Sequence, residues 1–126
     1  MRNKIVVAIM LISGALTLTM LYAAIAPQAA VQSMFQETPE GAMASVIVPN
    51  WGVLIALMGA LLIYGALHKP VRAPALIIAG VSKAAFIALV LAQGDRYLGG
   101  LGAAVAVDSV MVLLFALILI TGRARA

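Results

Sequence analysis

Residues 73–121 read APALIIAGVSKAAFIALVLAQGDRYLGGLGAAVAVDSVMVLLFALILIT, two long apolar runs joined by the polar turn Gly94-Asp95-Arg96. The runs, 73–93 and 98–121, each have the length of about 20 residues that a helix needs to cross the hydrocarbon core of a bilayer. Because a polar turn is unstable inside hydrocarbon, the stretch predicts an antiparallel pair of transmembrane helices.

Two further apolar runs, 5–26 and 49–67, precede this pair, and a basic turn at His68-Lys69-Pro70 follows the second. The 126 residues are 65% hydrophobic and 10% charged, with a mean hydropathy of +1.17. Soluble domains carry about 25% charged residues. The sequence therefore predicts an all-α integral membrane four-helix bundle that forms a single transmembrane domain, 1–126.

The first run has an alternative interpretation as a cleaved signal peptide, because a basic start precedes it and Ala24-Ile25-Ala26 resembles a cleavage site. Pro27 would follow the cut directly, and the run exceeds the roughly 7 to 15 apolar residues of a signal core. We therefore expect a retained first helix.

The connection 27–48 is predicted to lie on the outer side of the membrane. Glutamines recur at every fourth position on one side, and apolar residues fall on the other: Gln28, Gln32 and Gln36 against Val31, Met34 and Phe35. This pattern fits a short interfacial helix, and an ordered loop is the alternative. Thr38-Pro39-Glu40 is expected to break any such helix.

Basic residues near the run ends predict the orientation. Six lie on one side, namely Arg2, Lys4, Lys69, Arg72, Arg123 and Arg125, and only Arg96 lies on the other. By the positive-inside rule, both termini are cytoplasmic. Tyr64 would lie near the inner interface of the membrane. An outer aromatic belt would consist of Tyr22, Trp51 and Tyr97. So strong a bias disfavours dual topology.

Lys83 and Asp108 are the ionisable residues inside the predicted helices, equally distant in sequence from the centre of the turn. Each would cost roughly 2.5 to 3.5 kcal/mol if left unpaired at the centre of a membrane helix. Because they reach the same depth in an antiparallel pair, we predict that they form an ion pair. Small residues at every fourth position predict close packing of the two helices: Gly80, Ala84 and Ala88, with Gly100 and Ala104 opposite.

The predicted pair has three interpretations: a structural staple that sets helix register, a functional site (proton relay, ion-coupling site or polar anchor in a pocket), or no pair at all, with one residue meeting a partner subunit. Ser82 and Ser109 are neighbouring polar candidates. Asn50 and Trp51 are weaker candidates, because together they resemble a helix start with an interfacial anchor.

Several site classes are not expected. The chain has no cysteine and one histidine, His68, in a basic turn, so we predict no metal and no cofactor. The basic residues are scattered, which argues against nucleic acid. No phosphate-binding loop, nucleophile elbow or zinc-protease motif occurs, so we predict that the protein is not an enzyme.

The segment from Asn50-Trp51-Gly52 through Tyr64-Gly65, with Val81-Ser82-Lys83 and Val107-Asp108-Ser109, resembles the DoxX-like group of small bacterial four-helix membrane proteins. The resemblance covers most of the chain and rests on pattern. It implies the four-helix fold, a bacterial-type inner membrane, and a role as an accessory subunit of a membrane oxidoreductase or an assembly factor. It carries over no site residue.

Two functional hypotheses follow. In the first, the protein is a non-enzymatic accessory or scaffold component, or binds a small apolar molecule or lipid between its helices. In the second, it is a small transporter or channel subunit that uses Lys83 and Asp108 as an ion- or proton-coupled site. Its expected partners are the lipid bilayer and either further copies of itself or a larger membrane complex.

Overall fold

The computed structural model describes residues 2–38 and 40–125, without the side chains of residues 2, 3 and 125. Within these residues the structure contains helices and no strands, which confirms the all-α prediction. The elements are α1 (Arg2–Leu18), η1 (Thr19–Leu21), α2 (Tyr22–Ile25), α3 (Pro27–Phe35), α4 (Gly41–Leu67), α5 (Lys69–Leu91), α6 (Leu98–Ile120) and η2 (Arg123–Arg125).

Four helical segments are long and apolar enough to cross a membrane: Lys4–Ile25, Gly41–Leu67, Lys69–Leu91 and Leu98–Ile120. Many of their large apolar side chains are exposed on the outside of the bundle, among them Ile12, Leu57, Leu89 and Ile120. A soluble protein of this size rarely exposes so much contiguous apolar surface. The chain therefore has the properties of a multi-pass membrane protein.

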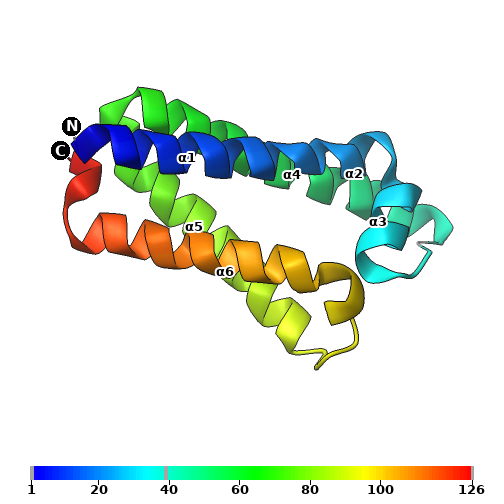
Figure 1. Ribbon diagram of the computed structural model, residues 1–126. Coiled ribbons are helices and arrows are strands. Elements are labelled where there is room, and N and C mark those ends of the chain that lie inside the picture. Colours follow the sequence, from blue (N-terminus) through cyan, green and yellow to red (C-terminus); the bar gives the residue numbers. More distant parts are fainter. Residues whose placement is uncertain (1, 39, 126) are drawn as a thin grey trace.

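The helices pack in sequence around the bundle (Figure 1). α1 lies along α4, α4 packs against α5, and α5 packs against α6, whereas α6 contacts α1 only slightly. α3 lies at one end of the bundle, where it reaches the start of α6. α1 begins and η2 ends at the opposite end, where the two elements contact each other.

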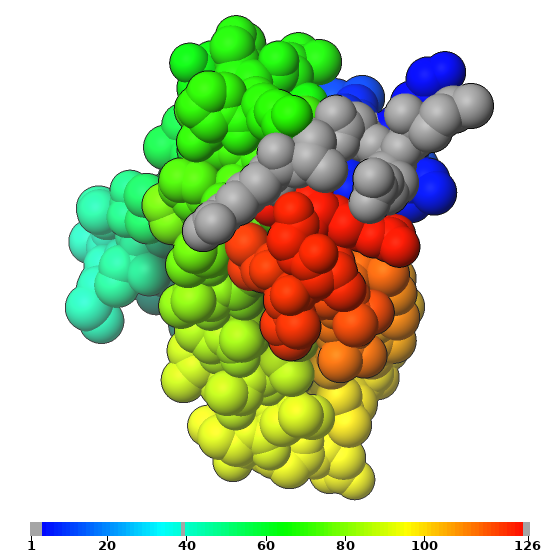
Figure 2. All heavy atoms as spheres, turned by 90° about the vertical axis from the view of Figure 1, so that its left-hand side faces the viewer, coloured from blue at the N-terminus to red at the C-terminus, as the bar shows by residue number. Residues whose placement is uncertain are grey.

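Figure 2 views the bundle from this opposite end. The red C-terminal residues lie over the end of α6, beside the green residues around the α4–α5 connection. Ala124 of η2 is buried there with Val6 of α1 and Ala75 of α5, so η2 closes this end of the core. The first residues of α4 project sideways at the far end and are largely exposed, as Met43 and Val46 illustrate.

Two helices extend beyond the predicted runs. α4 begins at Gly41 and not at Pro49, because the apolar residues before Pro49 continue the helix and the proline removes only one backbone donor. α5 begins at Lys69 and not at residue 73, because Pro70 lies in the first turn, where a helix has no need of that N–H. The predicted ends 67 and 93 lie at or within two residues of the observed ones.

The connection between the first two long helices contains α3, which is the helical alternative for residues 27–48. Its apolar side is buried at Ala30 and Val31, and its glutamines are exposed, as the four-residue repeat predicts. The helix ends at Phe35, and the next residue, Gln36, has a left-handed φ of 60°. Pro39, which was expected to break the helix, lies outside the described residues.

Glycines bring α1 and α4 into direct backbone contact. A Cβ added to Gly59 would lie 2.6 Å from the carbonyl oxygen of Gly14, closer than real Cβ atoms approach. The prediction that Gly80 and Gly100 bring α5 and α6 into close contact was wrong. Gly80 has only an ordinary contact with the Phe115 ring, and Gly100 faces α3. Sequence spacing identifies a stripe of small residues but not the helix that it meets.

Candidate ligand pocket

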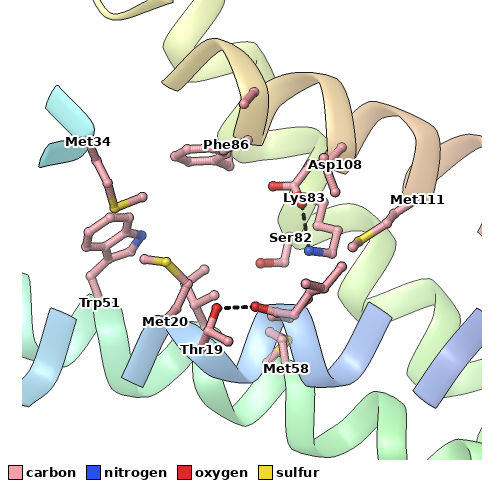
Figure 3. Close-up of a pocket in the computed structure, with 16 residues that line it drawn as sticks. Thr19, Met20, Met34, Trp51, Met58, Ser82, Lys83, Phe86, Asp108 and Met111 are labelled. Carbon is pink, nitrogen blue, oxygen red and sulfur yellow. Dashed lines mark hydrogen bonds and ion pairs between the residues drawn. The ribbon is translucent and has the colours of Figure 1, made fainter. Parts of the chain in front are cut away.

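Lys83 of α5 and Asp108 of α6 form an ion pair between the two helices. The lysine Nζ donates a hydrogen bond of 2.9 Å to Asp108 Oδ1. The lysine side chain is 8% exposed and the aspartate side chain 19% exposed, so the carboxylate is the more accessible partner. Figure 3 shows both side chains beside an internal space, with the Ser82 hydroxyl pointing into it.

This space is a pocket of about 300 Å³ between α1, α4, α5 and α6. Its volume is at the lower end of the range of small-molecule sites. Apolar side chains make up most of its wall, and the largest of them come from five different elements: Met20, Met34, Trp51, Met58, Phe86 and Met111. Methionine side chains are flexible and polarisable, so such a wall adapts to the shape of an apolar ligand.

The mouth of the pocket lies on the flank of the bundle, between α1 and α6. Leu16 and Thr19 line it from one side, Ala103 and Val107 line it from the other, and all four are exposed. The two helices contact each other only slightly, and α5 crosses behind the space between them (Figure 1). The opening therefore lies on the lateral surface of the bundle, beside exposed apolar side chains such as Leu16 and Val107.

The first long helix is irregular at this mouth. Its α-helical pattern tightens to a 3₁₀ turn at Thr19–Leu21 before α2 begins. The Thr17 hydroxyl donates to the Ser13 carbonyl at 2.7 Å, and the Thr19 hydroxyl donates to the Leu16 carbonyl. Such bonds back to the preceding turn satisfy the hydroxyls in apolar surroundings and bend helices.

α3 closes one end of the pocket, where Met34 reaches its wall (Figure 3). Phe35 holds α3 in place through edge-to-face contacts with Trp51 and Tyr97, at ring-centroid distances of 6.0 and 5.0 Å. Gly100 allows the close approach of α6, because an added Cβ would clash with the Met34 carbonyl. Only a glycine at this position leaves α3 seated on α6.

A polar contact at the surface reinforces the same closure. Arg96 Nη2, in the turn before α6, donates to Glu37 Oε2 at 3.2 Å, and both side chains are well exposed. The Glu37 carboxylate beside the Tyr97 hydroxyl raises the pKa of that phenol above its ordinary value of 10.0. Glu37 and Arg96 are 59 residues apart in the chain, so sequence spacing gives no signal of this contact.

The other sequence candidates divide into two groups. Ser82 and Trp51 line the pocket with Lys83 and Asp108. Ser109 instead donates to the Val105 carbonyl at 2.7 Å within its own helix, and Asn50 is exposed and lies outside the pocket wall. Across residues 2–38 and 40–125, no group of three or more His, Cys, Asp or Glu side chains could hold a metal ion.

The sequence reasoning missed the pocket wall. Four of the seven methionines lie there, as does Phe86, but they come from separate helices and form no periodic pattern along the chain. The high methionine content was the only available signal.

Arg72 is a second residue whose role differs from expectation. The orientation count takes it as a basic residue near the end of an apolar run, but it lies in α5 and is only 4% exposed. Its Nη2 donates to the Ala66 carbonyl at 2.9 Å and its Nε to that of Gly65 at 3.4 Å, so it caps the last carbonyls of α4. Its Nη1 is buried and has no partner among the described residues.

The pocket thus combines an apolar wall with one neutral pair of charges. Lys83 Nζ uses one of its donors on Asp108, and Asp108 Oδ2 accepts no hydrogen bond from the described part of the chain. The arrangement can bind and orient one polar group of an otherwise apolar molecule. Comparisons of the chain with protein-family models, with curated proteins and with solved structures find no match.

Proposed function

We propose that the protein is a non-enzymatic, multi-pass protein of a bacterial-type inner membrane that binds a small lipophilic molecule in the pocket between its helices. The observation that carries this proposal is the apolar cavity of about 300 Å³ with the Lys83–Asp108 pair in its wall. Ligand sites combine a mostly apolar lining with a few convergent polar groups in this way.

The position of the mouth supports a ligand that arrives through the membrane. Because the opening lies between α1 and α6 on the apolar flank, a molecule dissolved among the acyl chains reaches it without crossing water. α3 and η2 cover the two ends of the bundle, whereas the lining residues on the flank are exposed. We place both termini in the cytoplasm, since the basic residues gather at their end of the bundle.

A bound lipophile also fits an accessory role in a larger membrane complex or a homo-oligomer. The resemblance to the DoxX-like group suggests such a role, in which the protein would present its ligand to a partner. The exposed start of α4, with Met43, Val46 and Ile47 on its surface, gives a partner apolar area to contact.

A transporter or channel subunit is the second candidate function. The observation that favours it is the access of the cavity to the Asp108 carboxylate, because intramembrane charges often line ion and proton pathways. Proteoliposomes with an enclosed pH-sensitive dye test it. Proton flux that Asp108→Asn abolishes and Ser109→Ala retains would favour transport over binding.

Trp51 gives a direct test of ligand binding, because it is the only tryptophan and lies in the pocket wall. Undecanol carrying bromine at its chain end quenches indole fluorescence on contact. We expect saturable quenching of the protein in detergent micelles or nanodiscs. Ala104→Phe, which fills the pocket, should abolish the saturable part, whereas Ala106→Phe on an exposed face of α6 should retain it.

Random collision in the lipid phase gives quenching that rises linearly with probe concentration and is equal in both variants. If only that linear component appears, the binding proposal fails.

A further inference from the structure

We propose that the pocket selects an amphiphile whose head group is an uncharged hydroxyl, bound by Asp108 and Lys83 together. The inference rests on the proposed binding function and names the class of its ligand. Three features of the site carry it, namely its charge balance, the accessibility of its carboxylate and the position of its aromatic wall.

The charge balance favours an uncharged head group. Among the residues that line the pocket in the described chain, only Lys83 and Asp108 are ionisable, and they pair with each other at 2.9 Å. An anionic or cationic head would lose its hydration on entry and find no free countercharge, because each site charge is already neutralised. Desolvation of such an unmatched ion is costly, so the site discriminates against both signs.

The accessibility of the carboxylate favours a head group that donates a hydrogen bond. The Asp108 side chain is more exposed than that of Lys83, and Oδ1 accepts from the lysine while Oδ2 has no donor among the residues that the structure describes. A ketone, ester or ether can only accept. A hydroxyl can donate to Asp108 and accept from Lys83 Nζ or from the Ser82 hydroxyl, which points into the same space (Figure 3).

The wall around the rest of the pocket favours an apolar body. Trp51, Met20 and Met34 lie at the end nearest α3, away from the ion pair, and Phe86 lies between the two (Figure 3). A ligand with its hydroxyl on Asp108 therefore places its body against the indole ring. The Trp51 N–H faces the cavity in Figure 3, which keeps the ring within reach of a quencher on that body.

A series of head groups on one chain tests this inference with the unmodified protein. The probes are bromine-tagged undecanol, its methyl ether, the corresponding carboxylate and the corresponding trimethylammonium compound, each titrated against Trp51 fluorescence. We expect the alcohol to bind at least about tenfold more tightly than the ether, since a hydrogen bond to a charged group is lost. The two charged probes should bind more weakly than the alcohol.

Equal affinity of the alcohol and the ether, or tightest binding of a charged probe, would overturn the hydroxyl inference while the binding function stands. Absence of saturable binding for every probe would instead refute the binding function itself.

Asp108→Asn provides a second, independent comparison. The substitution keeps the size of the side chain and leaves Lys83 with a net positive charge in the pocket. We expect the carboxylate probe to gain affinity relative to the alcohol in Asp108→Asn. Ser109→Ala, on the same helix outside the pocket wall, should leave the ratio of the two affinities unchanged. An unchanged ratio of these two affinities in Asp108→Asn would show that the pair does not contact the head group.

Discussion

Gly14 of α1 and Gly59 of α4 lie face to face, so that a Cβ on either one would collide with the carbonyl oxygen of the other, at 2.7 and 2.6 Å. No side chain separates the two helices at this crossing. Because α1 and α4 approach so closely, the remaining space of the bundle lies between this helix pair and the helices α5 and α6, where the pocket is found.

Gly59→Ala should push α1 away from α4. We expect it to lower the free energy of unfolding by about 1–3 kcal/mol, the usual cost of overpacking, because the contacting atoms are rigid backbone. Thermal unfolding in detergent measures the effect. Gly102→Ala is the matched control, since an added Cβ there meets nothing within 4 Å. Equal stability of the two variants would contradict the direct backbone contact.

Lys83→Met and Asp108→Leu should each destabilise the protein strongly. Removing one partner leaves a buried charge without its counterion, which costs about 3–5 kcal/mol. The double substitution should recover most of this loss, because no buried charge then remains. A double variant as unstable as the two single losses added together would show that the pair contributes no coupling. Ser109→Ala should change stability little, since its hydroxyl bonds only within α6.

Arg72→Lys should destabilise the end of the bundle that carries the termini. A lysine keeps the charge but cannot reproduce the planar fork that bonds the Gly65 and Ala66 carbonyls, so we expect a loss of about 1–3 kcal/mol. Lys69→Arg, an exchange of the same two residue types at an exposed position, is the control and should have almost no effect. If Arg72→Lys is also neutral, the capping interaction is unimportant.

Glu37→Gln should lower the pKa of Tyr97 toward its ordinary value of 10.0, because the carboxylate that raises it is removed. A group whose pKa is raised by folding stabilises the fold below its unfolded pKa, and this contribution is lost as pH rises through the folded value. The attachment of α3 should therefore weaken at high pH. Ultraviolet absorbance of tyrosinate follows the titration, and Tyr97→Phe identifies its component among the three tyrosines. An unchanged titration in Glu37→Gln would contradict the contact.

Hydropathy and spacing determined much of this protein without reference to its structure. The apolar runs give the long helices, because a segment surrounded by hydrocarbon must satisfy its backbone within itself. The glutamine repeat at residues 28–36 anticipates α3, since burial of one face imposes the helical period. The equal distance of Lys83 and Asp108 from the turn puts both at one depth, because rise per residue is constant along a helix.

Only the tertiary structure decided which faces meet and where space remains. Spacing along one helix cannot tell that Gly100 faces α3 or that Gly59 meets Gly14, because contact depends on how another helix is rotated. The pocket wall is drawn from α1, α3, α4, α5 and α6, so its methionines leave no pattern in the chain. Arg72 is buried because α4 ends beside it with carbonyls that need hydrogen-bond donors. The sequence does not show that the end of α4 lies next to this arginine.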